Sequence, residues 1–440
     1  MILTIENLHA EACVDGGMGV LVFVMAVLPL TGTLTVPARA AGPVGEEGAA
    51  QGAAQEETSA QEGGAGQETS QPEPDPDGTV SWANLDSRIR EGSLSALILS
   101  ESITSLENLD YDQMYENLRK QINSIATAQW YITMMGGDSS SLDQAYDSLR
   151  DTFEDLKDGV TQEDNADLIW QLEDTVNQVV TGGETVYLTL LDLEQQAEDG
   201  QRGLETIDRN LEQLRLRQQL GQVSRQTVAE LEQTRSQTAS QLSVLDASIR
   251  QLKRQLETML GVTPTGEIAL APLPQMDESQ WENRDYEADL AAAKAASWTL
   301  RDAQNTLDDA KETWDDAQKD YRGPDEGYLL QMAEHTWNAA QLTYNSTVET
   351  FETSFRTLYD ALATSEETLA SAQSALAWQQ TLLSTAEQKY ALGLSSQSAV
   401  LDAQDDVASA QSTLDSAWRD LFSARNSYRW AVEYGLIQGS

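Results

Sequence analysis

The apolar positions of this chain follow a helical period over most of its length. The stretch between Gly327 and Gly393 contains neither glycine nor proline. As one helix this stretch would extend about 100 Å at 1.5 Å per residue. Helices in globular domains usually have about a dozen residues. The length therefore indicates a coiled coil.

Apolar and small residues recur at alternating spacings of four and three on both sides of Gly393, which keeps them on one side of each helix. The positions before the turn are Leu358, Leu362, Ser365, Leu369, Ala372, Leu376, Gln379, Leu383, Ala386 and Tyr390. The positions after it are Val400, Ala403, Val407, Ala410, Leu414, Ala417, Leu421, Ala424, Tyr428 and Ala431. We therefore predict an antiparallel hairpin, in which the alanines allow the helices to approach closely.

An earlier part of the chain repeats this pattern around Gly221. Its stripe before the turn runs from Val186 to Leu214, and its stripe after the turn from Val228 to Met259. These matches indicate an internal duplication of one helical hairpin.

The two turns share a glycine followed by a serine, within LGQVSRQ and LGLSSQS. Gly221 and Gly393 are predicted to end one helix in the left-handed conformation, because glycine adopts it at little cost. Ser224 in the first turn, and Ser395 or Ser396 in the second, would cap the next helix.

Changes in composition divide the chain into five segments. Each hairpin follows another predicted helix, starting at Thr79 or Trp281, and the return arm of the first hairpin could stack end to end on the helix that follows it. Gly261 and three later prolines indicate an extended crossover. We expect a signal-peptide-like leader at 1–41, a disordered acidic linker at 42–78, a first helical repeat at 79–262, a crossover at 263–280 and a second helical repeat at 281–440.

The leader has an apolar core from Met18 to Leu30, too short to span a bilayer comfortably, and small residues that would allow cleavage after Ala40. It departs from the usual signal peptide because no lysine or arginine precedes Arg39.

Charge and residue chemistry exclude several classes of function. The 72 acidic and 27 basic residues give a formal net charge of −45, which disfavours binding to nucleic acid or anionic lipid. Cys13 is the only cysteine, and His9 and His335 are the only histidines. The chain therefore has almost no residues that could form a disulfide, a metal site or a catalytic triad. We expect no enzyme activity and no cofactor.

The duplicated G-x-x-S turns, the very long helices and the segments YEADLAAAKAASWTLRDAQ and RNSYRWAVEYG resemble the TolC-like outer-membrane efflux protein family. The resemblance covers roughly Thr79 to Ile437. It implies an all-α fold of duplicated coiled-coil hairpins, three copies of which form a twelve-helix α-barrel. It also implies that the tips of this tube meet a membrane-fusion adaptor protein, which links it to an ABC-type or other pump.

The resemblance assigns roles to individual residues near the turns. Gly221, Ser224, Gly393 and Ser396 would form the adaptor-docking turns. Tyr390 and Asp402 match an aromatic and an acidic position of the narrowed entrance, and Glu230 is the corresponding candidate in the first half. Ala399 stands where a second acid is expected. Each acid can equally be a solvated surface charge, and each turn only a compact helix connection.

One departure from the family bears on localisation. TolC-like proteins insert β-strands before each long helix, whereas Lys319–Tyr328 is too short for two membrane strands and 131–167 is polar with a helical period. We therefore expect no membrane β-barrel. The leader predicts export to the cell envelope. The missing strands favour the cell-wall zone of a single-membrane envelope over an outer membrane.

Two hypotheses of different classes remain. The first is an exit duct of an efflux or secretion system, whose transported substrate the sequence does not identify. The second is an exported coiled-coil spacer or adhesion stalk without a conduit. A closed tube needs several chains, whereas a stalk can be monomeric or dimeric, so the oligomeric state distinguishes them.

Overall fold

The computed structural model describes residues 74–275, 281, 284–321, 323 and 327–437. The leader and most of the acidic linker therefore lie outside the described residues. The described chain contains ten helices and two strands of two residues each. None of these helices is both long enough and apolar enough to cross a lipid bilayer.

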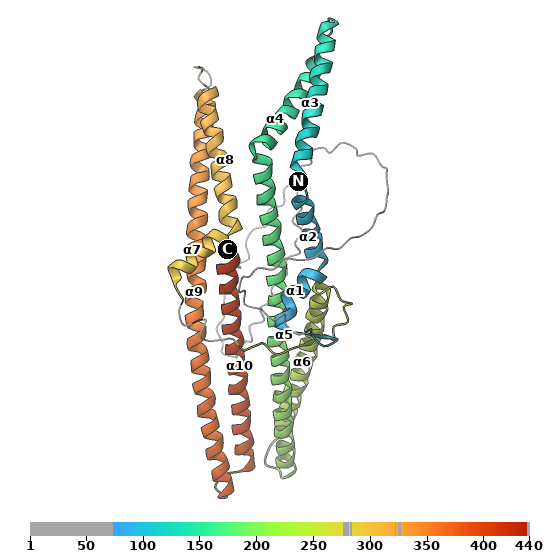
Figure 1. The fold of residues 1–440 in the computed structure, drawn as a ribbon. Helices are drawn as coiled ribbons and strands as arrows, with labels where there is room; N and C mark the ends of the chain where they lie inside the picture. Colours follow the sequence, from blue (N-terminus) through green and yellow to red (C-terminus); the bar gives the residue numbers. More distant parts are fainter. Residues whose placement is uncertain (1–73, 276–280, 282–283, 322, 324–326, 438–440) are drawn as a thin grey trace, which may run out of the picture. The chain divides into compact units, whose positions relative to one another are not determined.

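Four long helices form the two predicted hairpins (Figure 1). Helix α5 spans Val160–Gln219 and packs against α6, Arg225–Met259. Helix α9 spans Gly327–Ala391 without interruption and packs against α10, Gln397–Tyr434. The predicted helix between Gly327 and Gly393 is thus confirmed at 65 residues.

The heptad stripes lie along the seams of these hairpins. Leu190 and Leu256 are fully buried in the first hairpin, and Leu362 and Ala431 in the second. Most other stripe positions are half-buried, while Arg235 and Tyr390 remain exposed. The three-four spacing therefore identified the packed face of each helix.

Each hairpin is accompanied by a pair of shorter helices that the sequence predicts as one. Helices α1, Trp82–Gly92, and α2, Leu94–Glu107, are separated by Ser93. Helices α7, Tyr286–Ala296, and α8, Trp298–Asp320, are separated by Ser297. Both serines have extended backbone angles, so each helix is interrupted at one residue.

The expected helix starts at Thr79 and Trp281 are wrong by a few residues. Thr79–Val80 forms strand β1, and α1 begins only after Ser81. Helix α7 begins after Asp285, whose carboxylate accepts hydrogen bonds from the backbone N–H groups of Glu287 and Ala288. A side chain that caps the first turn determines where this helix begins.

The expected stacking of the first return arm on the following helix is also wrong. The end of α6 abuts the break between α1 and α2, where a Cβ atom added to Gly261 would lie 2.2 Å from the carbonyl oxygen of Gly92. The end of α10 abuts the break between α7 and α8, where a Cβ atom added to Gly435 would lie 2.3 Å from the Cα atom of Ser297. Each return helix therefore ends against the helix pair of its own half.

Helices α3, Tyr111–Met134, and α4, Ser140–Asp158, pack together between α2 and α5 in the chain. They contain most of the segment 131–167, whose helical period the sequence indicates. At the α4–α5 junction Gly159 adopts a positive φ of 92°, and α5 starts at the next residue. The helical prediction for this segment is confirmed.

The crossover between the halves returns to the start of the first half. Strand β2, Ala269–Leu270, pairs in parallel with β1, with Thr79 opposite Ala269. The Tyr187 hydroxyl on α5 lies 2.5 Å from the carbonyl oxygen of Ala271 and 3.4 Å from that of Val80. One buried side chain of the long helix therefore contacts both short strands.

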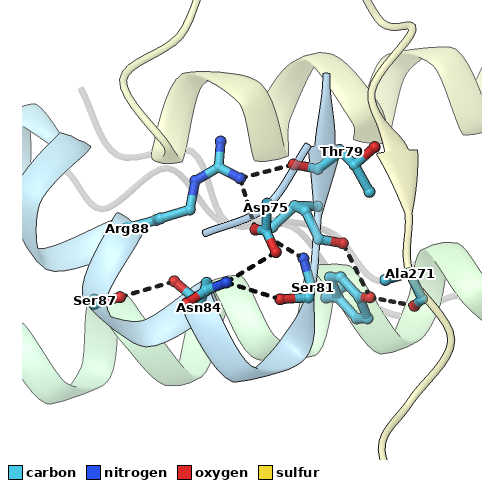
Figure 2. Close-up of polar contacts among 9 residues, drawn as sticks. Asp75, Thr79, Ser81, Asn84, Ser87, Arg88 and Ala271 are labelled. Carbon is cyan, nitrogen blue, oxygen red and sulfur yellow. Dashed lines mark hydrogen bonds and ion pairs between the residues drawn. The ribbon is translucent and has the colours of Figure 1, made fainter. Parts of the chain in front are cut away.

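Asp75 fixes the chain just before β1 (Figure 2). Its carboxylate accepts hydrogen bonds from the backbone N–H of Ser81 and the side-chain amide of Asn84, and it pairs with Arg88 at 3.0 Å. Burial raises the pKa of Asp75, but these hydrogen bonds outweigh it and leave the pKa below its ordinary value. The expected linker boundary at residue 78 is therefore a few residues too late, because Asp75 already belongs to the fold.

Two apolar clusters hold the helices together. The first lies among α1, α5, α6 and the strands and includes Leu85, Tyr187 and Leu256, with Trp430 from α10. The second joins α7, α9 and α10 and includes Phe355 and Tyr428. Because α5 also contacts α10, the four long helices follow the order α6, α5, α10, α9.

Candidate functional site

The two predicted docking turns have the same backbone geometry. Gly221 has a φ of 73°, and Gly393 has a φ of 71°. In the first turn the N–H of Gln222 donates to the carbonyl of Arg217 at 2.9 Å. In the second the N–H of Leu394 donates to the carbonyl of Lys389 at 2.8 Å. These bonds satisfy carbonyl groups that the end of a helix leaves without a partner.

Serine caps start both return helices. The Ser224 hydroxyl accepts from the N–H of Thr227 at 3.1 Å, and the Ser396 hydroxyl accepts from the N–H of Ala399 at 3.3 Å. Of the two serines that the sequence leaves open in the second turn, the cap is therefore Ser396. The four docking-turn residues occupy equivalent places in two equivalent connections.

The sequence interpretation missed the exposed leucines at these turns. Leu220 and Leu392, each directly before the turn glycine, are 65% and 73% exposed, and Leu394 is 75% exposed. The signal was present in the sequence, because a leucine precedes the glycine in both copies. Each turn thus offers an apolar side chain to solvent.

The three predicted entrance residues do not form one cluster. Glu230 is exposed on α6, where its carboxylate accepts from the side-chain amide of Gln226 at 2.9 Å. Tyr390 is 47% exposed in the last turn of α9, and Asp402 is exposed on α10. Within the described part of the chain, no hydrogen bond or ion pair joins these three side chains to one another.

A ladder of polar contacts between α5 and α10 was not predicted either. Nearest the turns, Asp405 pairs with Arg209 and accepts a hydrogen bond from Thr206 at 2.9 Å. The next level joins Arg202 to Ser412 at 2.6 Å. These contacts join residues that are far apart in the sequence, and nothing in the local pattern of either helix pairs them.

The ladder continues toward the ends of the return helices. Arg419 on α10 pairs with Asp192 on α5 at 2.5 Å. Beyond it, buried Glu184 accepts hydrogen bonds from Asn426 at 2.7 Å and from the indole N–H of Trp430 at 2.6 Å. Burial raises the pKa of Glu184, and these hydrogen bonds only partly oppose it. An open groove follows the ladder and is lined by Gln195, Asp199, Arg202, Ser412 and Ser416 among others.

Comparison with known proteins identifies the fold. Neither a protein-family model nor a curated protein matches the sequence. The outer-membrane channel OprN is 13% identical, with 80% of this chain and 89% of that chain covered and a TM-score of 0.51. A membrane protein from Pseudomonas aeruginosa is 10% identical over 81% and 91% of the two chains, also with a TM-score of 0.51. The outer membrane protein VceC from Vibrio cholerae is 14% identical over 80% and 95%, with a TM-score of 0.49.

At such low identities the first two matches bear on the fold alone. They cover 81% and 80% of this chain, so the shared fold includes its long helical hairpins. The chain therefore shares a fold of long helical hairpins with the outer-membrane channel OprN, and its own fold is all-α over the described residues, as its turns and long helices predict.

Proposed function

We propose that this chain is the exit duct of an efflux or secretion system, a tube of three copies that conducts substrate outward from a pump. The observation that carries the proposal is the pair of equivalent hairpins within a fold shared with an outer-membrane channel. Long helices joined by tight turns can form a wall, because each helix has neighbours on two sides and leaves a third face free. The proposal includes no enzyme activity and no cofactor.

The turns at Gly221 and Gly393 are the proposed docking site for a membrane-fusion adaptor protein. Their exposed leucines support this role, since apolar side chains at a rigid turn lose contact with water when a partner covers them. The adaptor would connect the duct to an ABC-type or other pump in the cytoplasmic membrane.

We further propose that the interior favours cations. The net charge of −45 is large for a chain of 440 residues, and a cleft lined by one sign of charge concentrates the opposite ion. Glu230, Tyr390 and Asp402 are retained as entrance residues, with the constriction formed only when several copies meet. Export to the cell envelope belongs to the same proposal, and placement in the cell-wall zone of a single-membrane envelope stays a prediction.

The molar mass of the purified protein tests the duct against the stalk. Light scattering at near-physiological salt should give three times the mass of the purified chain, which is 48.2 kDa when all 440 residues are present. The measured molar mass should not decrease on dilution, because a tube closed by long contacts between helices dissociates slowly. A monomer or dimer at every concentration would contradict the duct and favour the coiled-coil stalk.

A further inference from the structure

A pocket of about 590 Å³ lies where the two halves of the chain meet. Helices α1, α2 and α5 of the first half supply most of its walls, and the ends of α7 and α10 supply the rest. Pockets that bind drug-sized molecules usually have about 300–1,000 Å³. None of the lining residues borders the groove along the polar ladder or belongs to the predicted turns and entrance. The pocket is therefore a separate feature of the fold.

Two aromatic rings line this pocket, and each contacts a second ring. The ring centres of Trp170 on α5 and Trp298 on α8 are 6.1 Å apart. Those of Tyr434, at the end of α10, and Trp430 are 4.7 Å apart. Trp430 is fixed in turn, because its indole N–H donates to buried Glu184 at 2.6 Å. A ligand would therefore meet aromatic side chains that are already held in position.

Aliphatic side chains add to this apolar surface. Ala96 and Ile103 on α2 and Val176 on α5 line the same pocket, and both Ala96 and Val176 are buried. Contact with these side chains removes the apolar parts of a ligand from water, which favours binding. The pocket therefore suits a ligand that carries aromatic or aliphatic groups.

The acidic side chains of the pocket lack a basic partner. Glu173 and Asp174 on α5 and Glu433 on α10 line it, and none of them forms an ion pair within the described part of the chain. Glu173 and Glu433 are exposed, while Asp174 is half-buried. These carboxylates give the pocket a negative charge that a ligand of opposite charge would balance.

The basic side chain in the lining does not supply this balance. Nε of Arg90 lies 2.5 Å from the carboxylate of Asp86, and a terminal N–H of Arg90 donates to the side-chain oxygen of buried Asn177 at 2.7 Å. Burial raises the pKa of Asp174, and a hydrogen bond from Gln178 only partly opposes this effect. The charge of Asp174 is therefore exposed to the pocket without a cation beside it.

We infer that this pocket binds an organic cation that carries aromatic or aliphatic groups. Trp170 and Tyr434 contact the cation through their rings, since aromatic rings attract positive charge. Asp174 supplies the nearest opposite charge within the walls. The site lies within one chain, so the inference goes beyond the proposed duct and does not depend on its assembly.

The side-chain arrangement favours an organic cation over a metal ion. Among the described residues, no group of three or more acidic, histidine or cysteine side chains is placed to hold a metal ion. Calcium and magnesium require a close shell of oxygen ligands. An organic cation spreads its charge over more atoms, and separate carboxylates beside aromatic rings are enough to bind it.

Two ions of the same shape and opposite charge test this site. Tetraphenylphosphonium and tetraphenylborate both carry phenyl groups around a central atom, and they differ in the sign of their charge. Isothermal titration calorimetry of the purified chain at near-physiological salt should show tetraphenylphosphonium binding at one site per chain. Tetraphenylborate should bind at least about tenfold more weakly, because the carboxylates repel it.

Two substitutions in the pocket should weaken the binding of tetraphenylphosphonium. Trp170→Leu removes an aromatic ring and should raise the dissociation constant about three- to thirtyfold. Asp174→Asn removes a charge and should raise it about tenfold.

Two substitutions outside the pocket are the matched controls. Trp378→Leu removes an exposed tryptophan of α9. Asp420→Asn removes an aspartate of α10 whose pKa burial also raises. Both should leave the dissociation constant unchanged, and circular dichroism shows whether each variant has folded.

Binding that both pocket substitutions weaken and both controls preserve would support the inference. An equal loss in Asp420→Asn would show attraction to the acidic chain as a whole, and equal affinity for the two ions would show that charge is not recognised. Either result would overturn the inference, as would the absence of binding. Because binding needs only one chain, none of these results depends on the molar mass, which tests the duct separately.

Discussion

At the scale of single residues, the two turn glycines have the clearest physical requirement. Gly221 and Gly393 both have positive φ angles, of 73° and 71°, and a Cβ atom added to either would meet nothing within 4 Å. An added side chain would therefore not clash with its surroundings. Its only cost would be backbone strain, because the left-handed conformation is about 1–2 kcal/mol less favourable for L-residues. Glycine is therefore needed at these positions for the left-handed backbone conformation, and not because a larger side chain would clash.

We predict that Gly393→Ala lowers the free energy of unfolding by about 1 kcal/mol. The control is Gly203→Ala, within α5, where an added Cβ also meets nothing within 4 Å. Because that glycine is helical, alanine there should raise the free energy of unfolding by up to about 1 kcal/mol. Urea unfolding followed by circular dichroism measures both changes, and shifts in the same direction would contradict the argument.

Residue-level sequence reasoning was right where the chemistry is local. A left-handed glycine and a serine cap act on the backbone groups next to them, so the conformation of Gly393 and the cap at Ser224 could be identified, while the second cap was narrowed to Ser395 or Ser396. The roles of these residues in docking, and of Glu230, Tyr390 and Asp402 at an entrance, stay predictions. Those roles depend on other chains, which no local pattern describes.

At the scale of helices, the α5–α10 contact depends on a buried carboxylate. The side chain of Glu184 is 5% exposed and receives hydrogen bonds from Asn426 and Trp430, with Arg429 at 3.5 Å. Burial raises the pKa of Glu184 more than these partners lower it, and Asp86 raises it slightly further. The folded chain therefore holds the Glu184 proton more tightly than the unfolded chain does.

The sign of the pH effect follows from this difference. With its pKa raised on folding, Glu184 contributes stability that is fully present below its ordinary pKa of 4.5 and is lost as the pH rises above it. We predict that the difference in free energy of unfolding between the native chain and Glu184→Gln decreases as the pH rises from 4.5 through the raised pKa of Glu184. Urea unfolding at several pH values measures it, with exposed Glu230→Gln as the control. A difference that grows with pH would show that the carboxylate is better stabilised in the folded state.

The lengths of the helices and their packed faces could be predicted, because the spacing of apolar residues indicates which face of a helix is buried. The breaks at Ser93 and Ser297 could not, since each occurs where a return helix from far along the chain abuts the shorter pair. The pairing of β1 with β2 could not be predicted either, because strands of two residues are too short to show a periodic pattern. The polar ladder likewise joins residues that are distant in the sequence, such as Arg209 and Asp405.

At the scale of the whole molecule, the order of the long helices and the net charge determine how copies of the chain could assemble. The order α6, α5, α10, α9 places α6 and α9 at the two ends of the row, and the net charge of −45 makes copies of the chain repel one another. In the proposed function, the fold shared with an outer-membrane channel forms a conduit only through assembly. The proposed duct therefore needs several chains, and the proposed entrance residues would acquire a common position only in that assembly.

Single-particle electron microscopy of the purified protein tests this central claim most directly. We predict particles with threefold symmetry, built from twelve long helices around a continuous axial lumen. Particles in which the long helices pack against one another without a lumen, at any chain number, would contradict the duct and leave a coiled-coil stalk with a channel-like fold.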